Sequence, residues 1–209
     1  MMDANPATSP LNAVLEQAGL ERVDAHTASK FEQYVSLILR WNARLNLTAL
    51  RTEDAILFRH LTESIACARA LPEGMKTLLD FGSGAGLPGI PIALCRPDIA
   101  VTLAESQGKK AAFLQEAVRQ LGIAVKVHAD RAETIQDTFD CVVMRAVDRM
   151  PKAVVLAANL VGPGGWLALM TTTADLPKLQ EACGPNFQWY GAIPLPNSMD
   201  RILALGSRR

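Results

Sequence analysis

The 209-residue sequence predicts an α/β fold, in which a doubly wound, mainly parallel sheet follows a segment made only of helices. Two observations support this prediction. From residue 78 onward, short apolar runs typical of buried strands alternate with segments of helical periodicity. Directly after the first of these strands, glycine occupies three alternate positions, Gly82, Gly84 and Gly86. Because glycine lacks Cβ, this loop can turn sharply and approach a ligand closely.

The first seventy residues are expected to form a helical cap, residues 1–72, on a sheet domain of residues 73–209. Phe31, Val35 and Ile38 recur at helical spacing, and Pro72 ends the helical segment. The expected helices of the cap are residues 10–19, 28–45, 52–60 and 62–70.

The sheet domain is expected to continue the alternation to its last strands. Only seven residues separate the last two strands, which is too short for a crossover helix. We therefore expect an antiparallel hairpin, with the C-terminal strand at one edge of the sheet. The expected strands are residues 78–81, 101–104, 125–128, 139–144, 165–170, 187–193 and 201–205. The expected helices between them are residues 90–95, 109–121, 151–160 and 175–182.

Composition restricts the possible partners. The chain has 21 basic and 21 acidic side chains, so any nucleic-acid binding must come from a local patch.

No apolar run reaches the roughly 18 residues of a membrane span. Residues 1–10 do not resemble a secretory signal. Four scattered cysteines without a CxxC pair favour buried thiols, no metal site and a cytoplasmic protein.

Acidic residues flank the glycine loop and indicate its cofactor. Glu105 closes the next strand, 23 residues beyond Gly82, where a carboxylate can accept hydrogen bonds from both ribose hydroxyls. Asp80 directly precedes the loop, where it would repel a pyrophosphate and suit an ammonium group. The spacing GxGxG also differs from the GxGxxG of dinucleotide-binding proteins. We therefore favour S-adenosyl-L-methionine (AdoMet) over a dinucleotide, with Asp80, Gly84 and Glu105 at its site.

Five motifs match a known family in order and spacing. They are Trp41–Thr48 (WNxxxNLT), Arg59–Ser64 (RHxxDS, with Glu63 for Asp), Asp80–Gly89 (DxGxGxGxPG), Ser106–Leu114 (SxxKRxxFL) and Arg145-Ala146 (SRA). From about Leu11 to Leu205 the chain resembles the bacterial 16S rRNA guanine-N7 methyltransferases of the glucose-inhibited division B type.

The resemblance implies a class I AdoMet-methyltransferase (Rossmann-like) fold and methylation of guanine N7 in a loop of small-subunit rRNA. N7 carries a lone pair and no proton, so no catalytic base is expected. The implied partner is 16S rRNA or the small ribosomal subunit, and we expect a monomer. The family's AdoMet-contacting positions fall on Gly82, Leu87, Ala132, Glu133 and Arg145. The expected RNA contacts are Arg59, His60, Lys109, Lys110 and Arg201.

The chain departs from the family at two places. Met170-Thr171 replaces a Lys-Gly pair, and Met144 replaces the Ser before Arg145. Loss of the lysine leaves open a methyltransferase for another substrate, or a non-catalytic AdoMet-binding module on the ribosome. Arg145 also has two interpretations, as a contact to cofactor or substrate and as a structural ion-pair partner.

Overall fold

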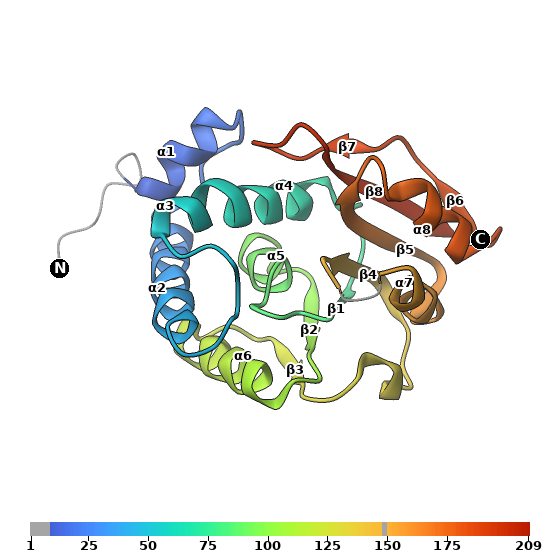
Figure 1. Cartoon of the computed structure of the whole chain (residues 1–209), viewed down its shortest axis with the longest axis horizontal. Helices are drawn as coiled ribbons and strands as arrows, with labels where there is room; N and C mark the ends of the chain where they lie inside the picture. Colours follow the sequence, from blue (N-terminus) through green and yellow to red (C-terminus); the bar gives the residue numbers. More distant parts are fainter. Residues whose placement is uncertain (1–8, 148–149) are drawn as a thin grey trace.

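The computed structural model describes residues 9–147 and 150–209, so the expectation for a secretory signal falls largely outside it. The centre is an eight-stranded sheet of order β3-β2-β1-β4-β5-β8-β6, in which β7 also pairs with β8 (Figure 1). Strands β1 to β5 are parallel, which confirms the predicted doubly wound sheet. The strands are β1 (Thr77–Phe81), β2 (Ala100–Ala104), β3 (Lys126–His128), β4 (Phe139–Arg145), β5 (Val161–Thr172), β6 (Phe187–Trp189), β7 (Ile193–Pro194) and β8 (Arg201–Arg208).

The order of the strands fixes where a ligand can bind. The chain adds β2 and β3 on one side of β1, then returns to add β4 and β5 on the other side. The strand order therefore reverses between β1 and β4. In open parallel sheets this switch point, at the carboxyl ends of the strands, is where ligands bind.

The predicted antiparallel pairing of the last strands is confirmed, but the predicted edge position of the C-terminal strand is wrong. The strand expected over residues 187–193 is divided into β6 and β7, and both pair antiparallel with β8. Strand β8 lies between β5 and β6, so β6 forms the edge. The burial of the five consecutive residues Ile202–Gly206 explains the order, since a strand covered on both faces belongs inside a sheet.

Helices cover both faces of the sheet. In Figure 1, α2, α4, α5 and α6 lie on one side, and α7 and α8 lie on the other. Neighbouring strand residues alternate between the two cores: Leu78 and Val143 belong to the first, Leu79 and Val142 to the second. The helices are α1 (Pro10–Gln17), α2 (Ala25–Asn42), α3 (Glu53–Ala55), a π-helix (Ile56–Leu61), α4 (Thr62–Ala70), α5 (Gly89–Cys95), α6 (Gly108–Leu121), a 3₁₀-helix (Ala132–Thr134), α7 (Met150–Asn159) and α8 (Leu176–Cys183).

The N-terminal helices differ from the prediction in two details. Helix α2 ends at Asn42, three residues before Leu45, because the buried Asn42 side chain bonds the loop that follows: its Oδ1 accepts from the backbone N–H of Leu47 and of Thr48. The two helices expected around residue 61 are one continuous helical run from Glu53 to Ala70. A π-helical segment takes the place of the expected break.

The helices before residue 72 pack directly on the sheet domain. Trp41 on α2 meets Phe113 on α6 edge to face, with ring centroids 5.7 Å apart. The buried Tyr34 hydroxyl, also on α2, donates to the carbonyl of Ala85 in the glycine loop. Residues of both segments belong to one hydrophobic core. The helical segment therefore helps to hold the glycine loop in place.

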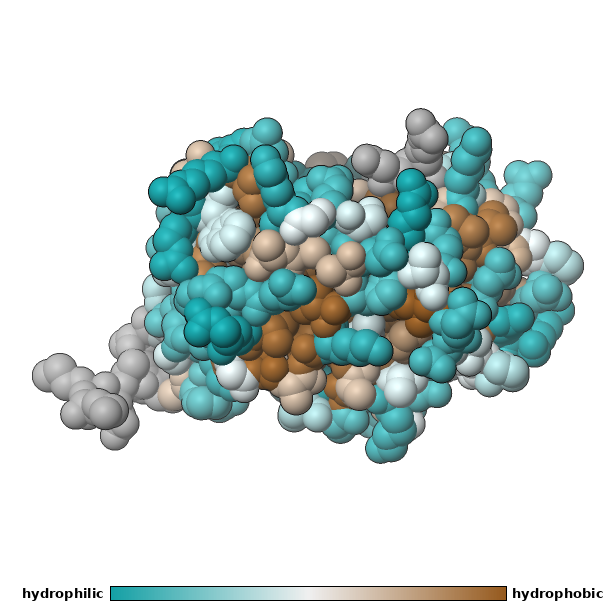
Figure 2. All heavy atoms as spheres, turned by 90° about the horizontal axis from the view of Figure 1, so that it is seen from below, coloured by the Kyte–Doolittle hydropathy of each residue, from teal (hydrophilic) through white to brown (hydrophobic). Residues whose placement is uncertain are grey.

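The edge of the sheet opposite β6 is formed by its shortest parallel strand. Strand β3 has three residues and forms the edge beside β2. Seen from below in Figure 2, hydrophobic residues are exposed between hydrophilic ones at this end of the molecule. Within the described residues, no helix has the length and apolar character needed to cross a membrane.

Candidate functional site

The glycine loop leads from the end of β1 into α5. Gly82, Gly84 and Gly86 have φ values of 74°, 56° and 83°, in the left-handed region that favours glycine. A Cβ on Gly86 would lie 2.6 Å from Cδ1 of Ile90, so this position also lacks space for a side chain. The backbone N–H groups of Gly82 and Ser83 both donate to the carbonyl of Ala104 at the end of β2. The loop is thereby fixed over the switch point.

Glu105 is bonded to the rim of the loop. Its Oε2 accepts from the N–H of Gly84 at 2.9 Å, and its Oε1 accepts from the N–H of Gln107 at 2.8 Å. The side chain is only 6% exposed. Each oxygen keeps a second lone pair, so the carboxylate can accept further bonds from a ligand's hydroxyls.

A cavity of about 460 Å³, called here the loop cavity, opens beside these residues. Its size falls within the usual range for small-molecule sites. The expected site residues that line it are Gly82, Gly84, Leu87, Glu105, Arg145, Arg59, His60 and Lys110. The remaining expected residues, which are not among its lining, are Asp80, Ala132, Glu133, Lys109 and Arg201.

Asp80 lies beneath the loop. It is 1% exposed, and its Oδ2 accepts from the N–H of Gly89 at the start of α5, at 3.0 Å. Burial raises the pKa of Asp80 to about 7. Its direct contact with a cofactor stays a prediction. The contact that the structure shows is structural, because the carboxylate holds the start of α5.

Ala132 and Glu133 lie in the short 3₁₀-helix after β3. Ala132 is buried in the second core, and Glu133 is exposed. The ends of β2 and β3 are adjacent, since the N–H of Glu105 donates to the carbonyl of His128 at 3.1 Å. The 3₁₀-helix therefore follows a strand end that directly adjoins Glu105.

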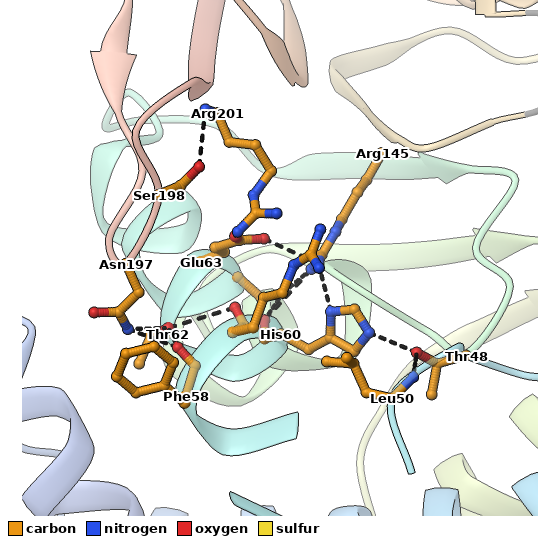
Figure 3. Close-up of polar contacts among 12 residues, drawn as sticks. Thr48, Leu50, Phe58, His60, Thr62, Glu63, Arg145, Asn197, Ser198 and Arg201 are labelled. Atoms are coloured by element: carbon orange, nitrogen blue, oxygen red, sulfur yellow. Dashed lines mark hydrogen bonds and ion pairs between the residues drawn. The ribbon is translucent and has the colours of Figure 1, made fainter. Parts of the chain in front are cut away.

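Arg145, at the end of β4, is the centre of a polar network that joins three distant segments (Figure 3). One guanidinium nitrogen lies 2.6 Å from Nδ1 of His60 and 3.0 Å from Oε2 of Glu63. The other donates to the hydroxyl of Ser64 at 3.2 Å. The second carboxylate oxygen of Glu63 pairs with Arg201 on β8. Both interpretations of Arg145 therefore have support, since it is an ion-pair partner and it lines the loop cavity.

His60 is held as a neutral imidazole. Burial, and next the charge of Arg145, lower the pKa of His60 to about 3. Since Arg145 donates to Nδ1, the proton is on Nε2, which donates to the hydroxyl oxygen of Thr48 at 2.6 Å. Both ring nitrogens are thus engaged, and neither is available as a general base.

Glu63 is the charge that sequence reasoning missed. It is 1% exposed between Arg145 and Arg201. Burial raises the pKa of Glu63, and the two guanidinium groups oppose that rise. The sequence offered one signal, a carboxylate four residues after Arg59 on the same helical run, which places both one turn apart.

A second cavity of about 300 Å³, called here the distal cavity, adjoins the loop cavity. Four residues line both cavities: Arg59, His60, Arg145 and Ala146. The distal cavity is further lined by Glu63, Met150, Met170, Thr171, Thr172, Asp175, Leu195 and Arg201. The two residues that replace the family's Lys-Gly pair, Met170 and Thr171, therefore face this cavity.

The cysteines lie outside the lining of both cavities. Cys67 and Cys141 are fully buried, and burial raises the pKa of Cys67 to about 12 and that of Cys141 well above its usual range. Among residues 9–147 and 150–209, no three His, Cys, Asp or Glu side chains form a group that could hold a metal ion.

Comparisons with known sequences identify relatives of the chain. The family model described as "GidB: rRNA small subunit methyltransferase G" matches residues 27–183. "Ribosomal RNA small subunit methyltransferase G" from Stenotrophomonas maltophilia (strain K279a) is 41% identical over 174 residues, which cover 81% of each chain. The protein of the same description from Neisseria meningitidis serogroup A is 40% identical over 162 residues, or 77% of each chain.

Solved structures support the same fold. A SAM-dependent methyltransferase from Aquifex aeolicus has a TM-score of 0.61 at 16% identity, covering 78% of this chain and 97% of its own. The ribosomal protein L11 methylase from Lactobacillus delbrueckii subsp. bulgaricus has a TM-score of 0.59 at 15% identity, covering 73% and 79%. At these identities the likeness concerns the fold alone, and it agrees with the class I methyltransferase fold.

Proposed function

The chain belongs to the rRNA small subunit methyltransferase G family, and from this premise we propose that it transfers a methyl group from AdoMet to N7 of a guanine in 16S rRNA. One observation supports this proposal most directly. The glycine loop and Glu105 line the same cavity as Arg59, His60 and Arg145. A nucleoside cofactor and a polyanionic substrate can therefore meet there.

The residues of the loop cavity fit AdoMet. We propose that Gly82, Gly84 and Leu87 contact its methionyl part, and that Glu105 accepts hydrogen bonds from its ribose hydroxyls. Ala132 and Glu133, which follow the strand end beside Glu105, are proposed to lie at the adenine. When bound, AdoMet supplies an electrophilic methyl group on a sulfonium. A dinucleotide is disfavoured by the family and by the buried Asp80 carboxylate beneath the loop.

The side chains around the cavity suit a reaction that needs no proton transfer. Guanine N7 has an in-plane lone pair and no proton, so its alkylation requires no base. His60 is neutral with both nitrogens engaged, and the described cysteines lie outside the lining of the cavity. Proximity and alignment are then the main contributions of the protein, worth up to about 7–11 kcal/mol in favourable cases.

RNA binding is proposed to depend on a local cluster of basic residues. The chain has no formal net charge, yet Arg59, Arg145 and Lys110 line the loop cavity, and Arg201 lies beside Arg145. Lys109 is exposed on the same helix as Lys110. Because guanine N7 lies in a deep groove of A-form RNA, the target is expected in a loop or unstacked. We further propose that the protein acts as a monomer in the cytoplasm.

Incubation with methyl-labelled AdoMet and small ribosomal subunits that lack the modification tests this function. Strand cleavage specific for 7-methylguanosine is expected to locate the label at one loop guanine. Labelling at another atom or on another molecule would contradict the proposed substrate, while the assignment as a methyltransferase would still hold. AdoMet binding without release of S-adenosylhomocysteine would instead indicate a non-catalytic module.

A further inference from the structure

The distal cavity is lined by charged side chains of both signs. At the end shared with the loop cavity lie Arg59 and Arg145, with Arg201 close by. Among the described residues, Glu63 is the carboxylate that pairs with these groups there, one oxygen with Arg145 and the other with Arg201. Arg59 is exposed, and its guanidinium has no hydrogen bond or ion pair with the rest of the described chain. The described side chains at the shared end therefore carry excess positive charge, and the Arg59 guanidinium is free to donate.

A carboxylate also lines the distal cavity, outside the part that it shares with the loop cavity. Asp175 lies between β5 and α8, and its Oδ2 accepts from the hydroxyl of Thr172 at 2.8 Å. The N–H of Asp175 donates back to the same hydroxyl at 3.2 Å, which fixes the turn. No described residue donates to the second carboxylate oxygen, so Asp175 can accept further hydrogen bonds. The walls of the distal cavity also include the buried apolar side chains of Met170 and Leu195.

This distribution of charge matches one base. Guanine presents two acceptors, O6 and N7, on one edge, and two donors, N1–H and the N2 amino group, on its Watson–Crick edge. Adenine presents a donor, N6, beside N7 and an acceptor, N1, on the opposite edge. An adenine with N7 at the shared end would place its amino group against the arginines and N1 against the Asp175 carboxylate.

We propose that the distal cavity holds the unstacked target guanine, with O6 and N7 toward Arg59 and the loop cavity, and with N1–H and the N2 amino group donating to Asp175. This inference rests on the proposed function and adds the determinant of base identity. Arg59 bonds O6 and leaves the N7 lone pair free to face the cofactor. Asp175 is then a specificity-determining residue that contacts the substrate and not the cofactor.

Replacement of the target guanosine by inosine tests the inference, because inosine keeps N7, O6 and N1–H and lacks only the N2 amino group. Single-turnover methylation is measured on small subunits reconstituted with either nucleoside at the target position. For the unaltered protein, inosine is expected to react about 10- to 100-fold more slowly, the effect of losing a hydrogen bond to a charged group. In Asp175→Ala, guanosine slows by a similar factor, and the guanosine-to-inosine ratio falls to about 1.

Two controls separate recognition from damage to the fold. Glu181→Ala removes an exposed carboxylate elsewhere on α8 and is expected to keep the full ratio. Asp175→Asn preserves the shape of the turn and is expected to reduce the ratio as well. The affinity for AdoMet, measured by calorimetry, is expected to remain unchanged in all three variants.

The outcomes distinguish this inference from the function on which it rests. Equal rates on guanosine and inosine with the unaltered protein would overturn the role of Asp175, while the proposed methyltransferase function would still hold. A ratio that survives Asp175→Ala would do the same. Absence of methylation on guanosine itself would reject the proposed function, and with it the inference.

Discussion

At the scale of single residues, the site depends on polar groups that are largely buried and held by hydrogen bonds. Glu105 bonds two backbone N–H groups, and His60 bonds Arg145 and Thr48. A buried polar group is costly when it loses its partners, so these side chains have one preferred arrangement.

Glu105→Gln tests the ribose contact. The amide loses the charge that strengthens hydrogen bonds from hydroxyls, and its NH₂ group cannot accept the bond from Gly84 or Gln107. We expect the dissociation constant for AdoMet to rise at least about tenfold in calorimetry. Glu116→Gln, on the outer part of α6, serves as the control and should bind as the unaltered protein does. Equal affinities in both variants would remove Glu105 from the site.

His60 predicts an acid-sensitive stability. Its folded-state pKa of about 3 lies below the ordinary value of 6.5, so between these values the unfolded chain binds a proton that the folded protein excludes. The free energy of unfolding should therefore fall as the pH drops from about 6.5 toward 3, by up to about 1.4 kcal/mol per pH unit from this group.

Urea unfolding at pH 7 and pH 5 measures this effect in His60→Gln. Glutamine can still accept from Arg145 and donate to Thr48 without titrating, so we expect a smaller loss of stability at pH 5. His26→Gln, at an exposed position of α2, is expected to behave as the unaltered protein. The prediction is wrong if His60→Gln and the unaltered protein lose the same stability.

At the scale of elements, the junction between β1 and α5 determines the shape of the site. The loop turns over Asp80, and α5 begins so close to β1 and β2 that its first residue has no room for a side chain. A Cβ on Gly89 would lie 2.3 Å from Cδ2 of Leu103 and 2.6 Å from Oδ2 of Asp80. The glycine is therefore required by packing, in contrast to the loop glycines, whose φ values are positive.

Gly89→Ala is expected to destabilise the protein by about 1–3 kcal/mol or more, because the buried neighbours must shift to admit the methyl group. Gly108→Ala is the matched control, since its Cβ would meet no atom within 4 Å at the start of α6. There we expect a change of less than about 1 kcal/mol, in the stabilising direction. Urea unfolding of both variants measures the difference, and similar effects in the two would contradict the packing argument.

At the scale of the whole molecule, the helices before residue 72 and the sheet domain share one core. Trp41 packs on Phe113, Tyr34 bonds the glycine loop, and Arg145 joins α4 to β4. We propose that the expected segments 1–72 and 73–209 fold as one cooperative unit. The helical segment is then a part of the binding site as well as a cover for the sheet.

Two tryptophan reporters test this cooperativity. In a double variant, Trp166→Phe and Trp189→Phe, the remaining Trp41 reports on the helical segment. In Trp41→Phe, the remaining Trp166 and Trp189 report on the sheet. After correction for the stability of each variant, measured by far-ultraviolet circular dichroism, each fluorescence transition should coincide with the global one. A fluorescence transition of Trp41 at lower urea would show that the helical segment unfolds separately.

The sequence by itself determined the strands, the glycine loop and the family. Strands such as β1 and β4 contain short apolar runs that are buried on both faces, and the loop is marked by glycines, whose backbone freedom is unique. Glu105 could be placed in the site because the carboxyl ends of parallel strands meet at one edge. These properties are local, or they follow from the spacing of elements along the chain.

Only the tertiary structure decided the partners of the charged residues. Arg145 lies 85 residues from His60 in the chain, and Arg201 is still further from Glu63, so no local pattern could pair them. The position of β8 inside the sheet was likewise decided by which faces it could bury. The contact of Asp80 with a cofactor stays a prediction from the sequence, and the tertiary structure adds the bond from the Gly89 N–H to its carboxylate. Burial and pairing across long separations depend on the whole fold, and they set the charge that each cavity presents.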